Sequence, residues 1–332
     1  MAQMKYFYEL TISSSPHAHS PVTTQTIMRD VLIALVPALL GSIYFFGFRA
    51  LLVTLVSAAA CVFFEWGFCR IRKLHCKTYD LSAVVTGVLL AFVCPVTIPY
   101  WTIILGDFFA IVLVKMLFGG LGKNIVNPAL AGRAFLFSWP VLMSNWVKVG
   151  FDNAAGLLST ADAVTAATPM SAMHQGALPE ESILDMFLGN IGGCIGETSA
   201  LLLIIGFVYL LYRKVITARI PLAYIGTVAI LAFLFPQGND RIAWMAAQVF
   251  GGGLMLGAIF MATDYVTSPL TKLGQIAYGI GCGVITILIR YFGGYSEGVT
   301  YAILCMNACA VLLDKIGRPV KFGAPKKEAA KK

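Results

Sequence analysis

The residues with the clearest chemical potential lie in a stretch of small side chains at positions 161–169. It contains the hydroxyls of Thr165 and Thr168 and the carboxylate of Asp162. It has no apolar run long enough to cross a bilayer. A segment of this kind either connects structural elements or lets another molecule approach the backbone closely.

This stretch is similar to the signal that exported flavin transferases recognise. Asp162 stands six residues before Thr168, and Ala167 directly precedes that threonine. Those enzymes join the phosphate of FMN to a threonine hydroxyl as a phosphoester. The usual signal has glycine where this chain has alanine at positions 163 and 166. The similarity implies covalent FMN at Thr168, with Asp162, Thr165 and Ala167 as parts of the signal.

The composition indicates a helical membrane protein. The chain has 332 residues, of which 58% are hydrophobic and 12% charged, and its mean hydropathy is +0.81. The apolar residues form continuous runs of about 17–20 residues, as transmembrane helices require, and do not alternate as in a transmembrane β-barrel. The net charge of +8 comes from basic residues between these runs, so it gives no support to nucleic-acid binding. The first run begins near Val31, behind a polar leader without a signal-peptide cleavage pattern.

The apolar runs predict an all-α polytopic protein with about ten transmembrane helices. In the first half we expect spans at 31–47, 50–68, 82–97, 101–117 and 129–146. In the second half we expect spans at 192–212, 220–235, 242–262, 276–291 and 299–313. The chain then divides into a cytoplasmic leader (1–30), a first transmembrane half (31–146), an outer loop (147–191), a second transmembrane half (192–314) and a basic tail (315–332).

The basic residues predict that both chain termini are cytoplasmic. With this orientation most lysines and arginines fall in inner loops or in the tail, as the positive-inside rule requires. The outer side receives only Arg49, Lys148, Arg241 and Arg290. The loop at 147–191 then faces outward, where an exported transferase could reach its threonines. We therefore expect a multi-pass protein of the bacterial cytoplasmic membrane.

A weak internal repeat relates the two halves. The matching segments are 86–92 with Pro95 and 227–233 with Pro236, and at the same offset Asn127-Pro128 matches Ser268-Pro269. Many transporters are built from two such halves. On the expected span count the repeat relates helices of the same orientation, and an inverted repeat would need one further re-entrant segment. Both arrangements stay open.

Two polar turns at the ends of predicted spans each precede a proline. The first covers 118–129 and contains Asn127, and the second covers 262–269 and contains Thr263 and Asp264. Glycines and free amides at a helix start can hold a phosphate or the edge of a flavin ring. A tight turn with close helix packing is the simpler alternative. These three residues and Arg133 are our candidates for a second flavin site or for support of the loops.

Charged residues within the predicted spans are candidates for an ion path. Arg133 requires a carboxylate, carbonyl groups or an anion as its partner, and Glu65, Asp107, Glu197 and Asp264 could supply the carboxylate. Asp107 and Glu197 lie farther from the span ends, so we expect them to line a cation path or to pair with another residue. For the other two, an orientation toward the membrane interface is an equal alternative.

The cysteines and histidines do not predict a metal site. None of the eight cysteines forms a Cys-x-x-Cys pair, and His17 and His19 have no third ligand nearby in the sequence. Cys305 and Cys309 lie one helical turn apart, but two thiols do not complete a cluster without a partner chain.

Several separate stretches resemble one family, which contains the D subunit of Rnf complexes and the B subunit of sodium-translocating NADH:quinone reductase. These stretches are 14–17, 118–135, 162–169, 263–264 and 267–269. The resemblance covers essentially the whole chain, and the short leader is more similar to the Rnf protein. It implies an electron-carrying subunit of an ion-translocating ferredoxin:NAD oxidoreductase, not catalytic alone, with FMN at Thr168 and a second, non-covalent riboflavin. It also implies other Rnf subunits and an exported flavin transferase as partners, and Na⁺ or H⁺ as the transported ion.

Two other functions stay open from the sequence. A secondary transporter or channel of the inverted-repeat type would account for two halves with carboxylates in the membrane. A purely structural membrane anchor for redox partners is the third interpretation. Neither of them needs the signal around Thr168, and a purified transporter would be colourless.

Overall fold

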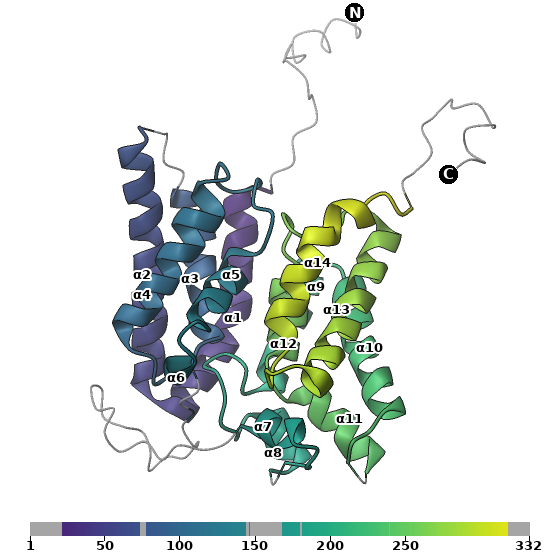
Figure 1. Ribbon diagram of the computed structural model, residues 1–332. Helices are drawn as coiled ribbons and strands as arrows, with labels where there is room; N and C mark the ends of the chain where they lie inside the picture. The colour runs from purple at the N-terminus through teal and green to yellow at the C-terminus, as the bar shows by residue number, and fades with distance from the viewer. Residues whose placement is uncertain are drawn as a thin grey trace, which may run out of the picture.

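The computed structural model describes residues 22–73, 78–143, 146, 168–179, 181–238 and 240–317, and within them every regular element is a helix (Figure 1). In chain order the elements are α1 (Thr24–Phe46), α2 (Phe48–Ile71), η1 (Thr78–Asp80), α3 (Ser82–Phe92), α4 (Tyr100–Phe108), η2 (Phe109–Met116), α5 (Pro128–Leu136), α6 (Pro140–Met143), α7 (Pro169–His174), α8 (Ile183–Leu188), α9 (Ala200–Tyr212), α10 (Arg219–Leu234), α11 (Arg241–Phe250), α12 (Leu254–Leu256), η4 (Gly257–Met261), α13 (Lys272–Phe292) and α14 (Val299–Leu313). Asp162, Thr165, Ala167, His17 and His19 lie outside the described residues.

The helices form two groups that stand side by side. Helices α1 to α5 make one group and α9 to α14 the other, while the short α7 and α8 lie at one end of the bundle (Figure 1). The start of α1 and the end of α14 lie at the opposite end. Helices α1 and α9 join the two groups. They pack closely at Gly206 on α9, where a Cβ at position 206 would clash with the carbonyl oxygen of Ala34 on α1. The buried Asp30 on α1 also accepts a hydrogen bond of 3.1 Å from Arg213, which follows α9.

Three helices, α1, α2 and α13, are each long and apolar enough to cross a membrane. A fourth membrane crossing is possible by length and composition if α11 and the following α12–η4 segment form one span with a bend of 58° between them. The remaining apolar segments are shorter helices. The protein is therefore a helical membrane protein, whereas the count of about ten spans stays a prediction.

Three of the predicted spans are wrong in extent, because their helices are shorter than expected. The helix expected over 129–146 ends at Leu136, the helix expected over 82–97 ends at Phe92, and the helix expected over 192–212 begins only at Ala200. In its described residues, each missing part is non-helical backbone or a single short turn. Such backbone is tolerated within a membrane protein only where its polar groups are paired inside the protein.

Two of these non-helical segments pair with each other. The amide of Ile195 donates to the carbonyl of Cys94 at 3.0 Å, and the amide of Gly196 donates to the carbonyl of Phe92 at 2.8 Å. A Cβ at position 196 would lie 2.3 Å from the Phe92 ring, so this contact requires glycine. The loop before α9 thus supplies hydrogen-bond donors to carbonyl groups at and after the end of α3.

Buried arginines donate to further carbonyls at two helix breaks. Arg49 on α2 donates to the carbonyls of Val96 and Thr97, at 2.8 and 3.3 Å, after α3. Arg290 on α13 donates to the carbonyls of Gln248 and Gly251, at 2.6 and 3.3 Å, where α11 ends. The sequence placed both arginines at the outer side as orientation signals. In the structure they are almost fully buried and hold the breaks in place.

The turn between η2 and α5 forms as the sequence predicts. The side chain of Asn127 caps α5 by accepting from the amides of Ala129 and Leu130, and Pro128 occupies the first turn of the helix. The amide nitrogen of the same side chain donates to the carbonyl of Met261 at 3.2 Å. This bond connects the turn to the end of η4 in the other half. The proposed internal repeat is not established by these contacts and stays a prediction.

Candidate functional site

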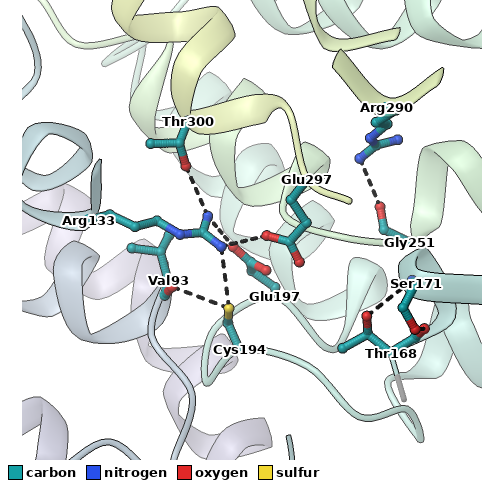
Figure 2. Close-up of polar contacts among 10 residues, drawn as sticks. All are labelled: Val93, Arg133, Thr168, Ser171, Cys194, Glu197, Gly251, Arg290, Glu297 and Thr300. Carbon is teal, nitrogen blue, oxygen red and sulfur yellow. Dashed lines mark hydrogen bonds and ion pairs between the residues drawn. The ribbon is translucent and has the colours of Figure 1, made fainter. Parts of the chain in front are cut away.

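Thr168 lies directly before α7, at the end of the bundle away from the start of α1. It is the N-cap residue of this helix, and its Oγ accepts a hydrogen bond from the amide of Ser171 at 3.3 Å. The Ser171 hydroxyl donates in turn to the Thr168 carbonyl at 2.6 Å (Figure 2). The threonine is only 6% exposed. The predicted attachment residue is therefore held in a fixed position, packed against its neighbours.

A small cavity connects Thr168 with a charged cluster in the bundle. About 270 Å³ of empty space lies between Thr168 and Met170 on one side and Glu197 and Glu297 on the other. Glycines at 192, 193 and 252 complete the wall. The structure thus brings the predicted attachment residue Thr168 and the predicted ion-path residue Glu197 to the same cavity, although they are well separated in the sequence.

The charged cluster is centred on Arg133, which α5 carries into the bundle from the first half. Its guanidinium donates to Glu197 and to Thr300, both at 3.2 Å, and makes a second, short ion pair with Glu297 (Figure 2). The Cys194 thiol lies 3.6 Å away. Arg133 and Glu197 are almost fully buried, and Glu297 is slightly more open. The expectation that Arg133 needs a buried carboxylate is met by two of them.

Glu297 was not among the predicted carboxylates. It lies in the short turn between α13 and α14, where a charged residue normally faces solvent. In the sequence it follows the glycines 293 and 294 in a short loop, and nothing there indicates burial. The packing of α14 against α5 brings it to Arg133. With two carboxylates for one guanidinium, the cluster is short of positive charge, and Arg290 stands nearby on α13 (Figure 2).

Three residues with metal-ligating side chains meet in this cluster. One ligand atom each of Cys194, Glu197 and Glu297 lies within 4.8 Å of the others. The Arg133 guanidinium contacts all three of these residues and is itself a cation in this place. Among the described residues this arrangement is an ion-pair cluster.

Three of the four candidates for a second flavin site come together at the other end of the bundle. Asn127, Thr263 and Asp264 line one cavity between the two halves, with about 740 Å³ of empty space that is partly open to solvent. The fourth candidate, Arg133, does not line the cavity. Its side chain lies instead beside Glu197 and Glu297.

Two further polar residues of this cavity were not predicted. The Asn124 side chain is buried, and its Oδ1 has no hydrogen-bond partner among the described residues. Lys115, on η2, is almost fully buried; it forms an ion pair with Glu65 at 3.0 Å and a hydrogen bond with Ser82 at 2.7 Å. Glu65 therefore points into the protein, and its alternative orientation toward the interface is wrong. The sequence signal for the burial of Lys115 was its place within an apolar run.

Comparison with known proteins places the chain in a family. The family model described as "NQR2, RnfD, RnfE family" matches residues 11–323. The chain belongs to this family. Its relatives include the D subunit of the Na(+)-translocating ferredoxin:NAD(+) oxidoreductase complex of Acetobacterium woodii, which is 46% identical over 323 residues and 96% of each chain.

Other members of the family are similar over nearly the same length. The D subunit of the proton-translocating ferredoxin:NAD(+) oxidoreductase complex of Clostridium ljungdahlii is 44% identical over 94% of this chain and 96% of its own. The D subunit of the ion-translocating oxidoreductase complex of Halorhodospira halophila is 36% identical over 93% of this chain and 94% of its own. The two more similar relatives carry different ions in their names, so identity alone does not indicate the ion.

Proposed function

We propose that this chain is the membrane electron-transfer subunit of an ion-translocating ferredoxin:NAD oxidoreductase, located in the bacterial cytoplasmic membrane and carrying FMN on Thr168. The relatives, similar along almost their whole length, are named as subunits of such complexes. The observation in the structure that carries the proposal is the place of Thr168. Its hydroxyl lies beside a buried charged cluster and at the end of the bundle where the outer loop is expected.

The residues around Thr168 fit a phosphoester at its Oγ. An ester oxygen still accepts a hydrogen bond, so the contact with the Ser171 amide can persist after attachment. The space beside Thr168 is smaller than a usual cofactor pocket, so the flavin ring would lie outside it. When bound, FMN supplies a redox group that accepts and gives up electrons. The chain holds that group by a covalent tether, which keeps it at high effective concentration near its redox partners.

The burial of Thr168 has a consequence for attachment. Because the residue is 6% exposed, a transferase cannot reach the hydroxyl while α7 is packed as in this structure. We infer that the exported flavin transferase acts before this segment packs against the bundle. The other subunits of the complex would then assemble around an already modified chain.

Measurement of the intact mass tests the attachment. The chain, made together with an active flavin transferase and purified under denaturing conditions, is expected to be heavier than its amino acids by one FMN less one water. The same chain made without the transferase serves as the control. If the two masses agree with each other and with the unmodified chain, the proposal of a covalent flavin is wrong.

We also propose that the cavity between the halves holds a second flavin, riboflavin, without a covalent bond. The unpaired Oδ1 of Asn124 is a buried acceptor that faces no donor among the described residues, and a flavin ring carries an N–H that could donate to it. Asn127 keeps one N–H of its amide free after its bond to Met261, and Lys115, which is paired with Glu65, also lines the cavity. These groups would bind and orient the ring.

The substitution Asn124→Leu is expected to remove this second flavin and to leave FMN on Thr168 in place. It takes away the unpaired acceptor and fills part of the cavity, so ring binding loses a hydrogen bond and space. Flavin released by denaturation is measured by chromatography, and covalent flavin is measured by gel fluorescence of the same sample. Leu121→Ala, in the same cavity wall but without a polar group, is the matched control and keeps the released flavin. An unchanged amount of released riboflavin in the Asn124 variant would contradict the site.

For ion translocation we propose Asp107 and Glu197 as candidates that contact the path of Na⁺ or H⁺. The two carboxyl groups differ in their surroundings. Glu197 is paired with Arg133, whereas Asp107 forms no ion pair with a described residue. A secondary transporter without a redox role is the second candidate function, since helix breaks inside the bundle also occur in transporters. It predicts a purified chain without flavin, so the mass measurement separates the two.

A further inference from the structure

Asp107 is a buried carboxyl group with an uneven environment. It lies near the end of α4 and is fully buried. Its Oδ1 lies 2.7 Å from the Ser57 hydroxyl and 3.2 Å from the Cys61 thiol, both on α2. Its Oδ2 is buried and has no hydrogen-bond partner among the described residues. One oxygen therefore has two neighbours and the other has none.

The cations nearest in the fold are already paired elsewhere. Lys115 on η2 contacts Glu65 of α2 and Ser82 of α3, and Arg133 on α5 contacts Glu197 and Glu297. Arg49, on α2, donates to backbone carbonyls after α3. The titratable groups that face this region besides these are the thiols of Cys61 and Cys94. No ion pair joins Asp107 to a cation in the part of the chain that the structure describes. An ionised carboxylate in such a place would be strongly unfavourable.

The hydrogen atoms around Ser57 point to the protonation state of Asp107. The Ser57 hydroxyl has one proton but two acceptors within reach, the carbonyl of Gly87 at 2.8 Å and Asp107 Oδ1 at 2.7 Å. The Gly87 carbonyl cannot donate. Each contact has a proton of its own when Asp107 carries a proton and donates it to Ser57, which donates to Gly87. The Cys61 thiol can still donate to the same carboxyl oxygen.

The structure holds these three residues together tightly. A Cβ at Gly87 would lie 2.7 Å from the Cα of Ala58, so α3 touches α2 directly beside Ser57. Immediately after Asp107 and Phe108, α4 continues as the π-helix η2. Such wider turns often occur at functional sites, because the helix can shift its register there.

We propose that Asp107 is a proton-binding site in the interior of this membrane protein, protonated in the present conformation and linked through Ser57 to the backbone of α3. The proposal deepens the proposed function, on which it rests for the role of an ion site in the complex. The ligand is a proton and not a sodium ion, because a hard cation takes several oxygen ligands. Apart from its own carboxyl, the hydrogen-bonding neighbours of Asp107 offer one hydroxyl oxygen and one sulfur.

Infrared difference spectroscopy of the purified complex tests the site. At neutral pH we expect a carbonyl stretch of the protonated Asp107 carboxyl group that shifts to lower frequency in D₂O. The band is expected to be lost completely in Asp107→Asn, a substitution of nearly equal size. In Ser57→Ala the band is expected to persist at a changed frequency, since the acid loses its acceptor. Glu197→Gln is the matched control and keeps the Asp107 band, because the hydrogen-bonding neighbours of Asp107 are Ser57 and Cys61.

Three results would overturn the assignment. The first is the same spectrum in the unmodified complex and in Asp107→Asn, which would show that Asp107 is ionised. The second is an unchanged frequency in Ser57→Ala. The third is loss of the band on addition of Na⁺ but not of K⁺, which would make sodium the ligand. None of these depends on FMN, whose attachment is read separately by intact mass, so failure of the proton site and failure of the proposed function are distinguishable.

Discussion

The variant Thr168→Ala is expected to lose all covalent flavin. Alanine has no hydroxyl, so no phosphoester can form at this position, and no other hydroxyl has the same place before α7. After denaturing gel electrophoresis of chains made with an active transferase, the unmodified chain should fluoresce as a flavoprotein and the variant should be dark. The expected change is complete loss, because non-covalent flavin is removed by the detergent.

Two control variants separate loss of attachment from loss of structure. Thr165→Ala removes the neighbouring hydroxyl of the signal and should keep the fluorescent band. Ser171→Ala removes the hydroxyl that donates to the Thr168 carbonyl, yet it keeps both the attachment oxygen and the amide that the oxygen accepts from. It should also keep the band. The alanine at 168 costs the helix its cap, about 0.5–2 kcal/mol, which is too little to prevent folding. A band of equal brightness in Thr168→Ala would reject the attachment site.

The second large effect is expected from Arg133→Met. Removal of the guanidinium leaves the carboxylates of Glu197 and Glu297 close together and buried without a counter-charge. Removing one partner from a buried ion pair typically costs about 3–5 kcal/mol. We therefore expect a clearly lower melting temperature of the purified complex, or loss of the folded chain from the membrane.

Further substitutions in the same cluster give the matched comparison. Glu197→Gln should be tolerated better than Arg133→Met, because the guanidinium keeps its pair with Glu297. The triple variant Arg133→Met, Glu197→Gln, Glu297→Gln should regain much of the lost stability, since it contains no unpaired charge. If Arg133→Met melts like the unmodified complex and the triple variant is no better, the cluster does not stabilise the contact between the halves.

The local features of the sequence predicted much of the helical structure. Continuous apolar runs gave helices within every predicted span, because burial of a helix in lipid depends on local composition. Asn127-Pro128 predicted the start of α5, since a cap and a first-turn proline act within a few residues. The grouping of Asn127, Thr263 and Asp264 at one cavity was also foreseen as a candidate site, from two polar turns placed at span ends.

The lengths of the broken helices could not be predicted from composition. Residues 137–146 and 192–199 are as small or apolar as many helical segments. The loop before α9 pairs its backbone with partners distant in sequence, because the amides of Ile195 and Gly196 donate to the carbonyls of Cys94 and Phe92. Hydrophobic periodicity contains no information on such pairing.

By itself the sequence determined that the chain is a helical membrane protein, because apolar runs have few other stable solutions, and it marked Thr168 through a local signal. The tertiary structure decided which charges meet. It placed Glu297 beside Arg133, Lys115 beside Glu65, and Asp107 beside Ser57 without a cation among the described residues. Partners of a buried charge are chosen by the packing of helices far apart in the chain, and the energy of that choice appears only when the whole bundle has closed.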